Sequence, residues 1–290
     1  MDFKTIAILG PGLLGGSLAL SLRRLCPDVQ VHLWGRRRVV IDEIVQNDLV
    51  DLASTDLKEV LAKADLVILT TPVGIMQELS LAIRDVGGMA SGCIITDVGS
   101  VKEPVMQVFD QVFGDTDITC IGSHPMAGSE KMGMAHARDD LFEGACCVLT
   151  PPADSSEVED AKLQALQQFW EKLGMRVRVM PSAEHDCLVA RISHLPHLVA
   201  AAVVEVAFDG EAKATELAGT GFIDSTRIAA GAPEMWTEIL MENRLAVMAE
   251  LKVLQAQLGD AYAFLEEKDE ENLMRFLSDA KGHRDSVAER

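Results

Sequence analysis

The chain has 290 residues, 48% of them hydrophobic, and a formal net charge of −19 at pH 7. The hydrophobic share is sufficient for a packed core, and the length suits two domains or one large domain. The acidic balance argues against binding to nucleic acids or anionic membranes, because the protein surface repels phosphate groups. An anionic small molecule therefore needs a local pocket of basic side chains.

The six cysteines form neither a metal pattern nor a disulfide pattern, since the sequence contains no C-x-x-C pair and no Cys/His spacing typical of zinc. No signal segment precedes the first strand pattern, so we expect a cytoplasmic protein. The longest apolar stretch, residues 188–208, contains Arg191, His194, His197 and Glu205, which favours a buried helix over a membrane span.

Strand and helix patterns alternate through the first 181 residues. Short apolar runs predict strands at 4–9, 29–34, 65–72, 93–100, 118–121, 144–152 and 175–181. Amphipathic segments predict a helix after the first glycines and further helices at 37–47, 57–63, 75–86, 101–113 and 156–173. This alternation predicts an α/β fold with a parallel, doubly wound sheet.

After Pro181 the pattern is helical only. Helices are predicted at 183–208, 212–218, 224–230, 233–258 and 261–279, followed by a frayed polar tail. Pro196 is expected to kink the first of these helices. We therefore divide the chain into a nucleotide-binding domain, residues 1–181, and an all-α domain, residues 182–290.

A glycine motif points to a dinucleotide cofactor. Gly10, Gly12 and Gly15 form G-x-G-x-x-G between a predicted strand and a predicted helix. These glycines allow a tight turn, close approach of a pyrophosphate and close packing of helix on strand, as in Rossmann-type domains. The helix N-terminus offers free N–H groups to the phosphates.

The end of the second strand favours NADP over NAD. It reads Trp34-Gly35-Arg36-Arg37-Arg38, with no acid before Asp42, and arginines at this place can pair with a 2′-phosphate. The alternative is a basic helix start that binds no ligand. Cofactor contacts are expected at Gly10, Gly12, Leu13, Leu14, Gly15, Gly35, Arg36, Arg37, Thr71, Pro72 and Ser100.

His124 is the leading candidate for proton transfer. It follows the predicted strand 118–121 in a segment that Gly122, Pro125 and Gly128 mark as an ordered loop. Ligands of open α/β sheets bind beyond the carboxyl ends of the strands, where a histidine can take a proton near neutral pH. A loop histidine that only bonds to backbone is the alternative.

Ser100 has two possible roles. Its hydroxyl can orient a substrate hydroxyl or the nicotinamide, or it can cap the helix that starts at Val101, with Glu103 completing a capping box.

The helical domain supplies further polar residues. Asp186, His194 and His197 fall within an arc of about 80° on one helix face. They can bind a ligand or satisfy one another. Asp224 and Arg227 lie one turn apart among apolar neighbours, so Arg227 is expected to be partly buried and directed at a carboxylate, although a surface ion pair is the alternative.

Five segments carry a family resemblance: GPGLLGGSLA, DVGSVK, GSHPMAGSE, SHLPH and GFIDSTRIAAGAPEMW. In this order and at these spacings they resemble the prephenate and arogenate dehydrogenases of tyrosine biosynthesis, over nearly the whole chain. The resemblance implies a helical dimerisation and substrate domain, a homodimer, and oxidative decarboxylation of a cyclohexadienyl carboxylate without a metal. It also implies that His124 is the base on the ring hydroxyl, with Ser100 beside it.

The substrate-binding set that the resemblance implies is His194, His197, Arg227, Glu130, Trp236, Asp186 and Asp224. In this set Asp186 and Asp224 hold Arg227, and Glu130 gates the site. Ile223 departs from family members that carry a second cation before the aspartate, which leaves arogenate open beside prephenate. Any feedback by tyrosine is expected at the active site, since the length leaves no room for an appended mutase or regulatory module. A hydroxyacid dehydrogenase, an imine reductase and a non-catalytic redox sensor remain alternatives.

Overall fold

The computed structural model describes residues 3–128, 133–153, 157–209 and 213–288. Its first part is built on a six-stranded sheet of order β3-β2-β1-β4-β5-β6, in which every neighbouring pair is parallel. The strands are β1 (Thr5–Leu9), β2 (Gln30–Trp34), β3 (Leu52–Ser54), β4 (Leu66–Leu69), β5 (Ile94–Asp97) and β6 (Thr119–Cys120). The strand order reverses between β1 and β4, the place where such sheets bind ligands.

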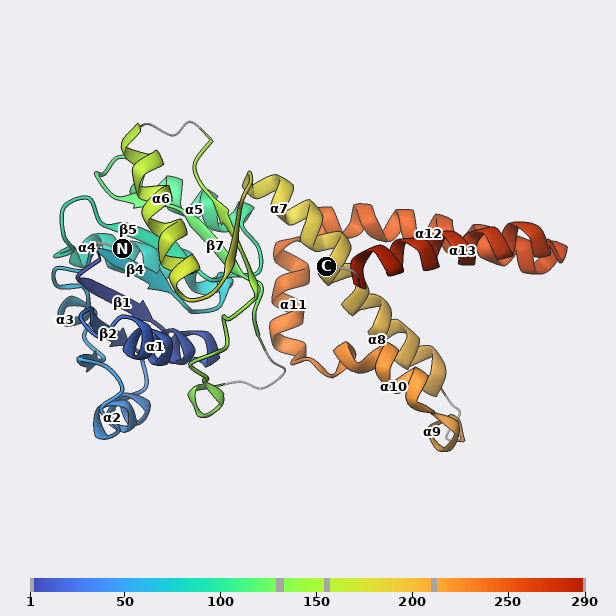
Figure 1. The fold of residues 1–290 in the computed structure, drawn as a ribbon, viewed down its shortest axis with the longest axis horizontal. Coiled ribbons are helices and arrows are strands. Elements are labelled where there is room, and N and C mark those ends of the chain that lie inside the picture. The colour runs from blue at the N-terminus through green and yellow to red at the C-terminus, as the bar shows by residue number, and fades with distance from the viewer. Residues whose placement is uncertain (1–2, 129–132, 154–156, 210–212, 289–290) are drawn as a thin grey trace.

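Helices cover both faces of this sheet (Figure 1). They are α1 (Leu13–Leu25), α2 (Arg38–Gln46), α3 (Leu57–Leu61), α4 (Met76–Val86), α5 (Glu103–Phe113) and α6 (Glu157–Lys172). The packing forms two apolar clusters, one with α1, α2 and α6, and one with α3, α4 and α5. The predicted doubly wound architecture is confirmed, and β3 is a strand that the pattern did not predict.

A second, three-stranded sheet corrects the prediction around His124. It contains β7 (Gly122–Pro125), β8 (Cys146–Thr150) and β9 (Arg176–Val179), with β7 antiparallel to β8 and β8 parallel to β9. His124 therefore lies on a strand and not in a loop. Glycine and proline are tolerated here because β7 is an edge strand, which needs few ladder bonds.

The second part of the chain is helical and extends from the sheets as two arms (Figure 1). Its elements are α7 (Ser182–Val189), a π-helical turn (Ala190–His194), α8 (Leu195–Phe208), α9 (Ala214–Leu217), α10 (Thr220–Thr226), a 3₁₀ turn (Arg227–Ala230), α11 (Pro233–Glu242), α12 (Arg244–Glu267) and α13 (Glu270–Ala288). Helices α12 and α13 lie side by side and form one arm, and α8, α9 and α10 form the other.

Three details of this part differ from the prediction. The helix predicted at 233–258 is divided at Asn243, and α12 ends only at Glu267, before Lys268 in a left-handed conformation (φ 58°). Helix α13 continues through the tail that was expected to fray. The π-helical turn ends at His194, two residues before Pro196, where a kink was expected. Such a widened turn accommodates the backbone hydrogen bond that proline cannot donate.

Residues Ser182–Phe208 form the one described helix whose length and composition would suffice to cross a membrane. Only 28% of its most apolar window is buried, so the expectation of a buried helix is wrong for the single chain. Its first half nevertheless carries the buried side chains of His185, Asp186 and His194, which contact the site described below.

Candidate active site

The glycine motif forms an open cradle at the end of β1. Gly10 has φ +131°, a conformation that favours glycine, and a Cβ atom at Gly15 would lie 2.7 Å from the Thr70 hydroxyl. At Gly12 a Cβ would meet nothing within 4 Å, so the space before it is free. Helix α1 starts at Leu13 with no side-chain cap and no acid in its first turn. Its free N–H groups fit a pyrophosphate.

Two further features suit a nucleotide at this edge. The buried hydroxyl of Thr71 has no hydrogen-bond partner among the described residues. At the end of β2, Arg36 and Arg37 are exposed, whereas Arg38 is paired with Asp42 at 2.8 Å. The cradle therefore combines an unsatisfied hydroxyl with two cations that make no ion pair within the described part of the chain.

The 3₁₀ turn that follows β4 (Val73–Ile75) and the N-terminus of α5 are bonded to carboxylates from the helical domain. Asp186 accepts hydrogen bonds from the backbone N–H groups of Lys102 and Glu103, both at 2.8 Å. Glu238 accepts one from the N–H of Gly74 at 2.5 Å. Of the two roles considered for Ser100, the helix cap is therefore wrong: α5 begins at Glu103 and is capped by Asp186. The N-terminus of α5 is therefore occupied by a carboxylate, whereas that of α1 has no side-chain cap.

His124 is backed by a histidine that the sequence analysis missed. His124 Nδ1 lies 2.8 Å from His185 Nε2, and His185 Nδ1 lies 2.7 Å from Asp186 Oδ1. The chain of contacts crosses from β7 to α7 and ends at the α5 N-terminus. His185 could not be selected from helical periodicity, because this residue lies about 100° from Asp186 around the helix, outside the arc that holds Asp186, His194 and His197.

Burial and a neighbouring cation hold His124 in its neutral form. Desolvation is the main cause that lowers its pKa well below the usual 6.5, and the Lys102 ammonium lowers it further. The Lys102 ammonium is itself fully buried, pairs with Asp97 and donates to the Ser123 carbonyl at 2.9 Å. An unprotonated imidazole at this place is ready to accept a proton.

A second polar group lies on the helical side of the site. The rings of His197 and Trp236 are stacked, with centroids 3.6 Å apart and planes 13° apart. The Trp236 ring is 6.3 Å from that of His194. His197 is 6% exposed, and its buried Nδ1 has no partner among the described residues. A stacked, unsatisfied imidazole suits a bound polar ligand.

The buried amide of Asn243 connects the two groups. Its Nδ2 donates to the Asp186 carbonyl at 2.8 Å and lies 3.1 Å from His194 Nδ1. Burial lowers the pKa of His194 to about 4, so this ring is also neutral near pH 7. No sequence pattern marked Asn243, because it was assigned to the middle of a helix.

The structure does not bring every expected residue into this group. Arg227 and Asp224 are exposed, and within the described residues neither Asp224 nor Asp186 pairs with Arg227, so the expected holding contacts are wrong. Asp186 is committed to the α5 N-terminus instead. Ser100 is half-buried at the end of β5. Glu130 lies outside the described residues.

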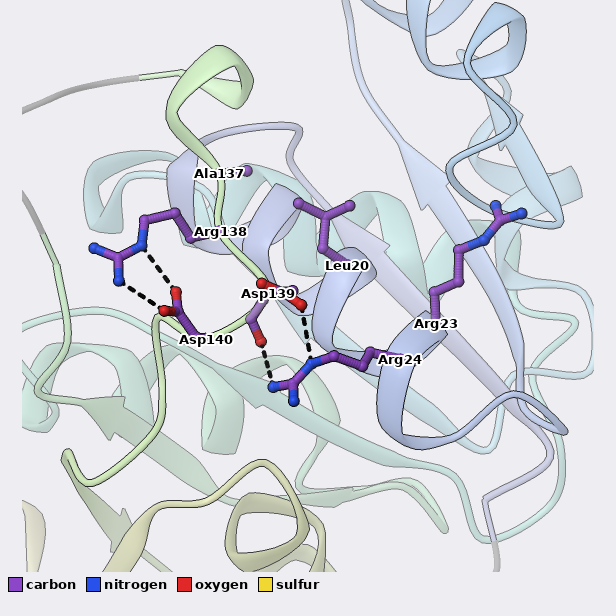
Figure 2. A pocket seen from close by; sticks show the side chains of 7 residues that line it. All are labelled: Leu20, Arg23, Arg24, Ala137, Arg138, Asp139 and Asp140. Atoms are coloured by element: carbon purple, nitrogen blue, oxygen red, sulfur yellow. Dashed lines mark hydrogen bonds and ion pairs between the residues drawn. The ribbon is translucent and has the colours of Figure 1, made fainter.

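A hollow on the outer face of α1, about 690 Å³ in volume, is separate from this group (Figure 2). Its arginines are already paired: Arg24 with Asp139 at 3.0 Å and Arg138 with Asp140 at 2.8 Å, as Figure 2 shows. The hollow shares no lining residue with the histidine group and offers no unpaired arginine, since Arg23 pairs with Asp48 outside it.

Comparisons with known proteins agree with this geometry. The family models "Prephenate dehydrogenase, nucleotide-binding domain" and "Prephenate dehydrogenase, dimerization domain" match residues 18–179 and 181–279. A cyclohexadienyl dehydrogenase from Zymomonas mobilis is 30% identical, with 96% of this chain and 94% of the relative covered.

Two solved structures have the same fold along nearly the whole chain. Prephenate dehydrogenase from A. aeolicus, in complex with hydroxyphenyl propionate and NAD+, is 28% identical with a TM-score of 0.89, and 99% of each chain is covered. Synechocystis arogenate dehydrogenase is 30% identical with a TM-score of 0.84, covering 98% of this chain and 99% of that one. This chain therefore belongs to the prephenate dehydrogenase family of NAD-dependent oxidoreductases.

Proposed function

We propose that this chain converts prephenate to 4-hydroxyphenylpyruvate by oxidative decarboxylation, with NADP as the favoured cofactor, in tyrosine biosynthesis. The observation that carries the proposal is the neutral imidazole of His124, backed by His185 and Asp186, on the strand β7 whose Ser123 N–H donates to Asp97 at the carboxyl end of β5. A neutral base beside a dinucleotide site is what dehydrogenation of an alcohol requires.

In the proposed reaction His124 takes the proton of the ring hydroxyl. A nicotinamide dinucleotide held by Gly10, Gly12 and Gly15 would supply the hydride acceptor for the carbon that carries this hydroxyl. The carbonyl formed there receives the electron pair of the breaking C–C bond as the ring carboxylate leaves as CO2, and the ring becomes aromatic. The phenolate oxygen then regains a proton. Ser100, half-buried at the end of β5, orients the hydroxyl or the nicotinamide in this proposal.

Arg227, His194, His197 and Trp236 are proposed to bind the substrate. Arg227 has no partner in its own described chain, so its guanidinium is free to pair with a carboxylate. The ring of His197 is stacked on Trp236, and its buried Nδ1 has no hydrogen-bond partner among the described residues. Glu130 is proposed to gate access, on the resemblance alone.

Arogenate is the second candidate substrate. It is supported by the similarity to the Synechocystis arogenate dehydrogenase and to the cyclohexadienyl dehydrogenase. Ile223 also removes a cation that a keto-acid side chain would use. Prephenate stays the first choice because His194 and His197 can supply polarity for its keto-acid side chain.

The NADP preference is proposed from Arg36 and Arg37. Both are exposed beside the cradle, and no carboxylate at the end of β2 is available to bind a ribose 2′-hydroxyl, since Asp42 is paired with Arg38. The A. aeolicus relative was solved with NAD+, so NAD is the alternative cofactor.

We also propose a homodimer formed by residues 182–290 and a cytoplasmic location. Only Val247 is buried among the residues of α12. Leu245, Met248, Val253 and Leu258 are more than half exposed, an apolar surface that a second copy would cover. All six cysteines are free, as in a reducing compartment. Light scattering on the purified protein tests the dimer, and a monomer at micromolar concentration contradicts it.

The decisive experiment is a kinetic matrix of prephenate, arogenate and short hydroxyacids against NAD and NADP. We expect turnover of prephenate with the highest kcat/KM and a loss of about 10²–10⁴-fold in kcat for His124→Asn, with cofactor affinity unchanged. Turnover of hydroxyacids alone, or full activity of His124→Asn, would overturn the proposal.

A further inference from the structure

His124 and His194 belong to one hydrogen-bonded network with Asp186 at its centre. The Asp186 carboxylate reaches His124 through His185, and the Asp186 backbone carbonyl reaches His194 through Asn243. Neutral histidine has one ring nitrogen that donates and one that accepts, and its neighbours decide which is which. The donor and acceptor atoms along each branch can therefore be deduced from the group at its start, which can only accept a hydrogen bond.

The first branch starts at the carboxylate. Asp186 accepts N–H bonds from Lys102 and Glu103, so its Oδ1 is an acceptor for the ring of His185 as well. A neutral His185 then carries its hydrogen on Nδ1 and its lone pair on Nε2. Its Nε2 lies 2.8 Å from His124 Nδ1, which donates to it in this state. The lone pair of His124 is left on Nε2.

The second branch starts at the carbonyl. A carbonyl oxygen can only accept, so the Asn243 Nδ2 that faces the Asp186 oxygen at 2.8 Å is correctly oriented as the amide donor. The second hydrogen of this amide faces His194 Nδ1 at 3.1 Å. His194 Nδ1 then accepts, and its hydrogen is on Nε2. His194 therefore carries its hydrogen on Nε2, whereas His124 carries its hydrogen on Nδ1.

We propose that His185 and Asn243 are positioning residues that hold the two histidines in opposite tautomers, His124 as a proton acceptor and His194 as a hydrogen-bond donor, both at Nε2. The identity of the ligand between them rests on the proposed function. A ligand that offers a hydroxyl to His124 and an oxygen lone pair to His194 matches this pair. An ammonium group at His194 does not, because it has no lone pair.

The network also allows the positive charge that forms on His124 during catalysis to move to His185. When His124 Nε2 receives the substrate proton, its Nδ1 proton can pass to His185 Nε2, so that the imidazolium lies beside the Asp186 carboxylate. The other groups that face His124 are the Lys102 ammonium and the ring of His194, and both disfavour a charge on His124 itself. No further proton donor or acceptor is needed to balance this transfer.

The direct test is nuclear magnetic resonance of the full-length protein labelled with ¹⁵N-histidine, because ring-nitrogen shifts distinguish a protonated from an unprotonated nitrogen. The chain has seven histidines, which single variants can assign. At neutral pH we expect protonated Nδ1 in His124 and protonated Nε2 in His194. The same tautomer in both rings would overturn the proposal, and this measurement needs neither turnover nor a folded variant at His185.

Two substitutions at His185 add a kinetic test. His185→Gln retains an oxygen that can accept from His124, whereas His185→Phe does not. We expect kcat to fall by about 10²-fold in His185→Phe and clearly less in His185→Gln, with KM little changed. The acidic limb of kcat/KM should move to lower pH in His185→Phe, since an acceptor that stabilised protonated His124 is gone. A shift to higher pH would mean that His185 acts only as a like-charged neighbour and would overturn the assignment.

Asn243→Asp tests the other branch, because a carboxylate accepts where the amide donates. We expect His194 to move its hydrogen to Nδ1 and KM for prephenate to rise about tenfold with a smaller change in kcat. His283→Gln, on the exposed face of α13, is the matched control and should change neither tautomers nor kinetics. If the tautomers are as expected but prephenate is not turned over, the proposed function fails and the network assignment stands.

Discussion

Replacing Gly231 by alanine tests whether the stacked pair of His197 and Trp236 binds the substrate. Gly231 has φ −62° and ψ 153°, which alanine adopts without strain, so the effect of the substitution is steric. The new methyl group would lie 2.7 Å from Trp236 Cδ1 and 3.1 Å from His197 Cε1. Carbon atoms pack at about 3.5–4.0 Å, so the two rings together must move by about 1 Å.

This displacement has two measurable consequences. Overpacking costs about 1–3 kcal/mol of the free energy of unfolding. A misplacement of about 1 Å in a binding site lowers kcat/KM by about 10²-fold. Since the rings are proposed to bind and not to transfer protons, most of the loss should appear as a higher KM for prephenate.

The assay is steady-state reduction of NADP, together with thermal unfolding followed by circular dichroism. Gly282→Ala is the matched control, because nothing lies within 4 Å of its Cβ position on α13. It should gain about 0.5–1 kcal/mol of stability and keep wild-type kinetics. If Gly231→Ala folds with unchanged KM and kcat, the stacked pair does not contact the substrate and the reasoning is refuted.

Three further outcomes are expected. Arg36→Ala should raise KM for NADP much more than KM for NAD, and equal effects would remove the 2′-phosphate argument. Arg227→Ala should weaken substrate binding by about 1.5–3 kcal/mol, seen as a higher KM; an unchanged KM would contradict its role. The His194 pKa is lowered from 6.5 to about 4, so the unfolded chain binds one more proton than the folded chain in this window. Stability should therefore fall by about 3 kcal/mol as pH drops from 6.5 to 4, and urea unfolding should show that this slope is smaller in His194→Phe, which cannot be protonated.

Local sequence patterns were sufficient for most of the sheet domain. Continuous apolar runs identified β1, β4 and β5, because strands buried on both faces need apolar residues throughout. The glycines of the cradle were also readable, since close approach of backbone at Gly10 and Gly15 excludes any other residue. Patterns failed at β7, where glycine and proline were read as a loop.

The helical domain shows the limit of periodicity more clearly. The break at Asn243 has no local signal, because it depends on hydrogen bonds to Asp186 and His194, far away in the sequence. In the same way Asp186 was read as a partner of Arg227, whereas it caps a helix of the other domain. Periodicity assigns a residue to a helix face but does not say what that face meets.

The sequence by itself was sufficient for the architecture and the family, and it predicted the dinucleotide site and the role of His124. These follow from local rules: apolar periodicity, backbone freedom at glycine, and motifs that lie within one turn and its flanking elements. Only the tertiary structure decided that His185 backs His124, that Asn243 connects Asp186 to His194, and that carboxylates of the helical domain bind the N-terminus of α5 and the 3₁₀ turn before α4. Those contacts join residues from different elements. Which partner a side chain bonds to depends on how the elements pack in three dimensions, and no repeating pattern in the sequence indicates that packing.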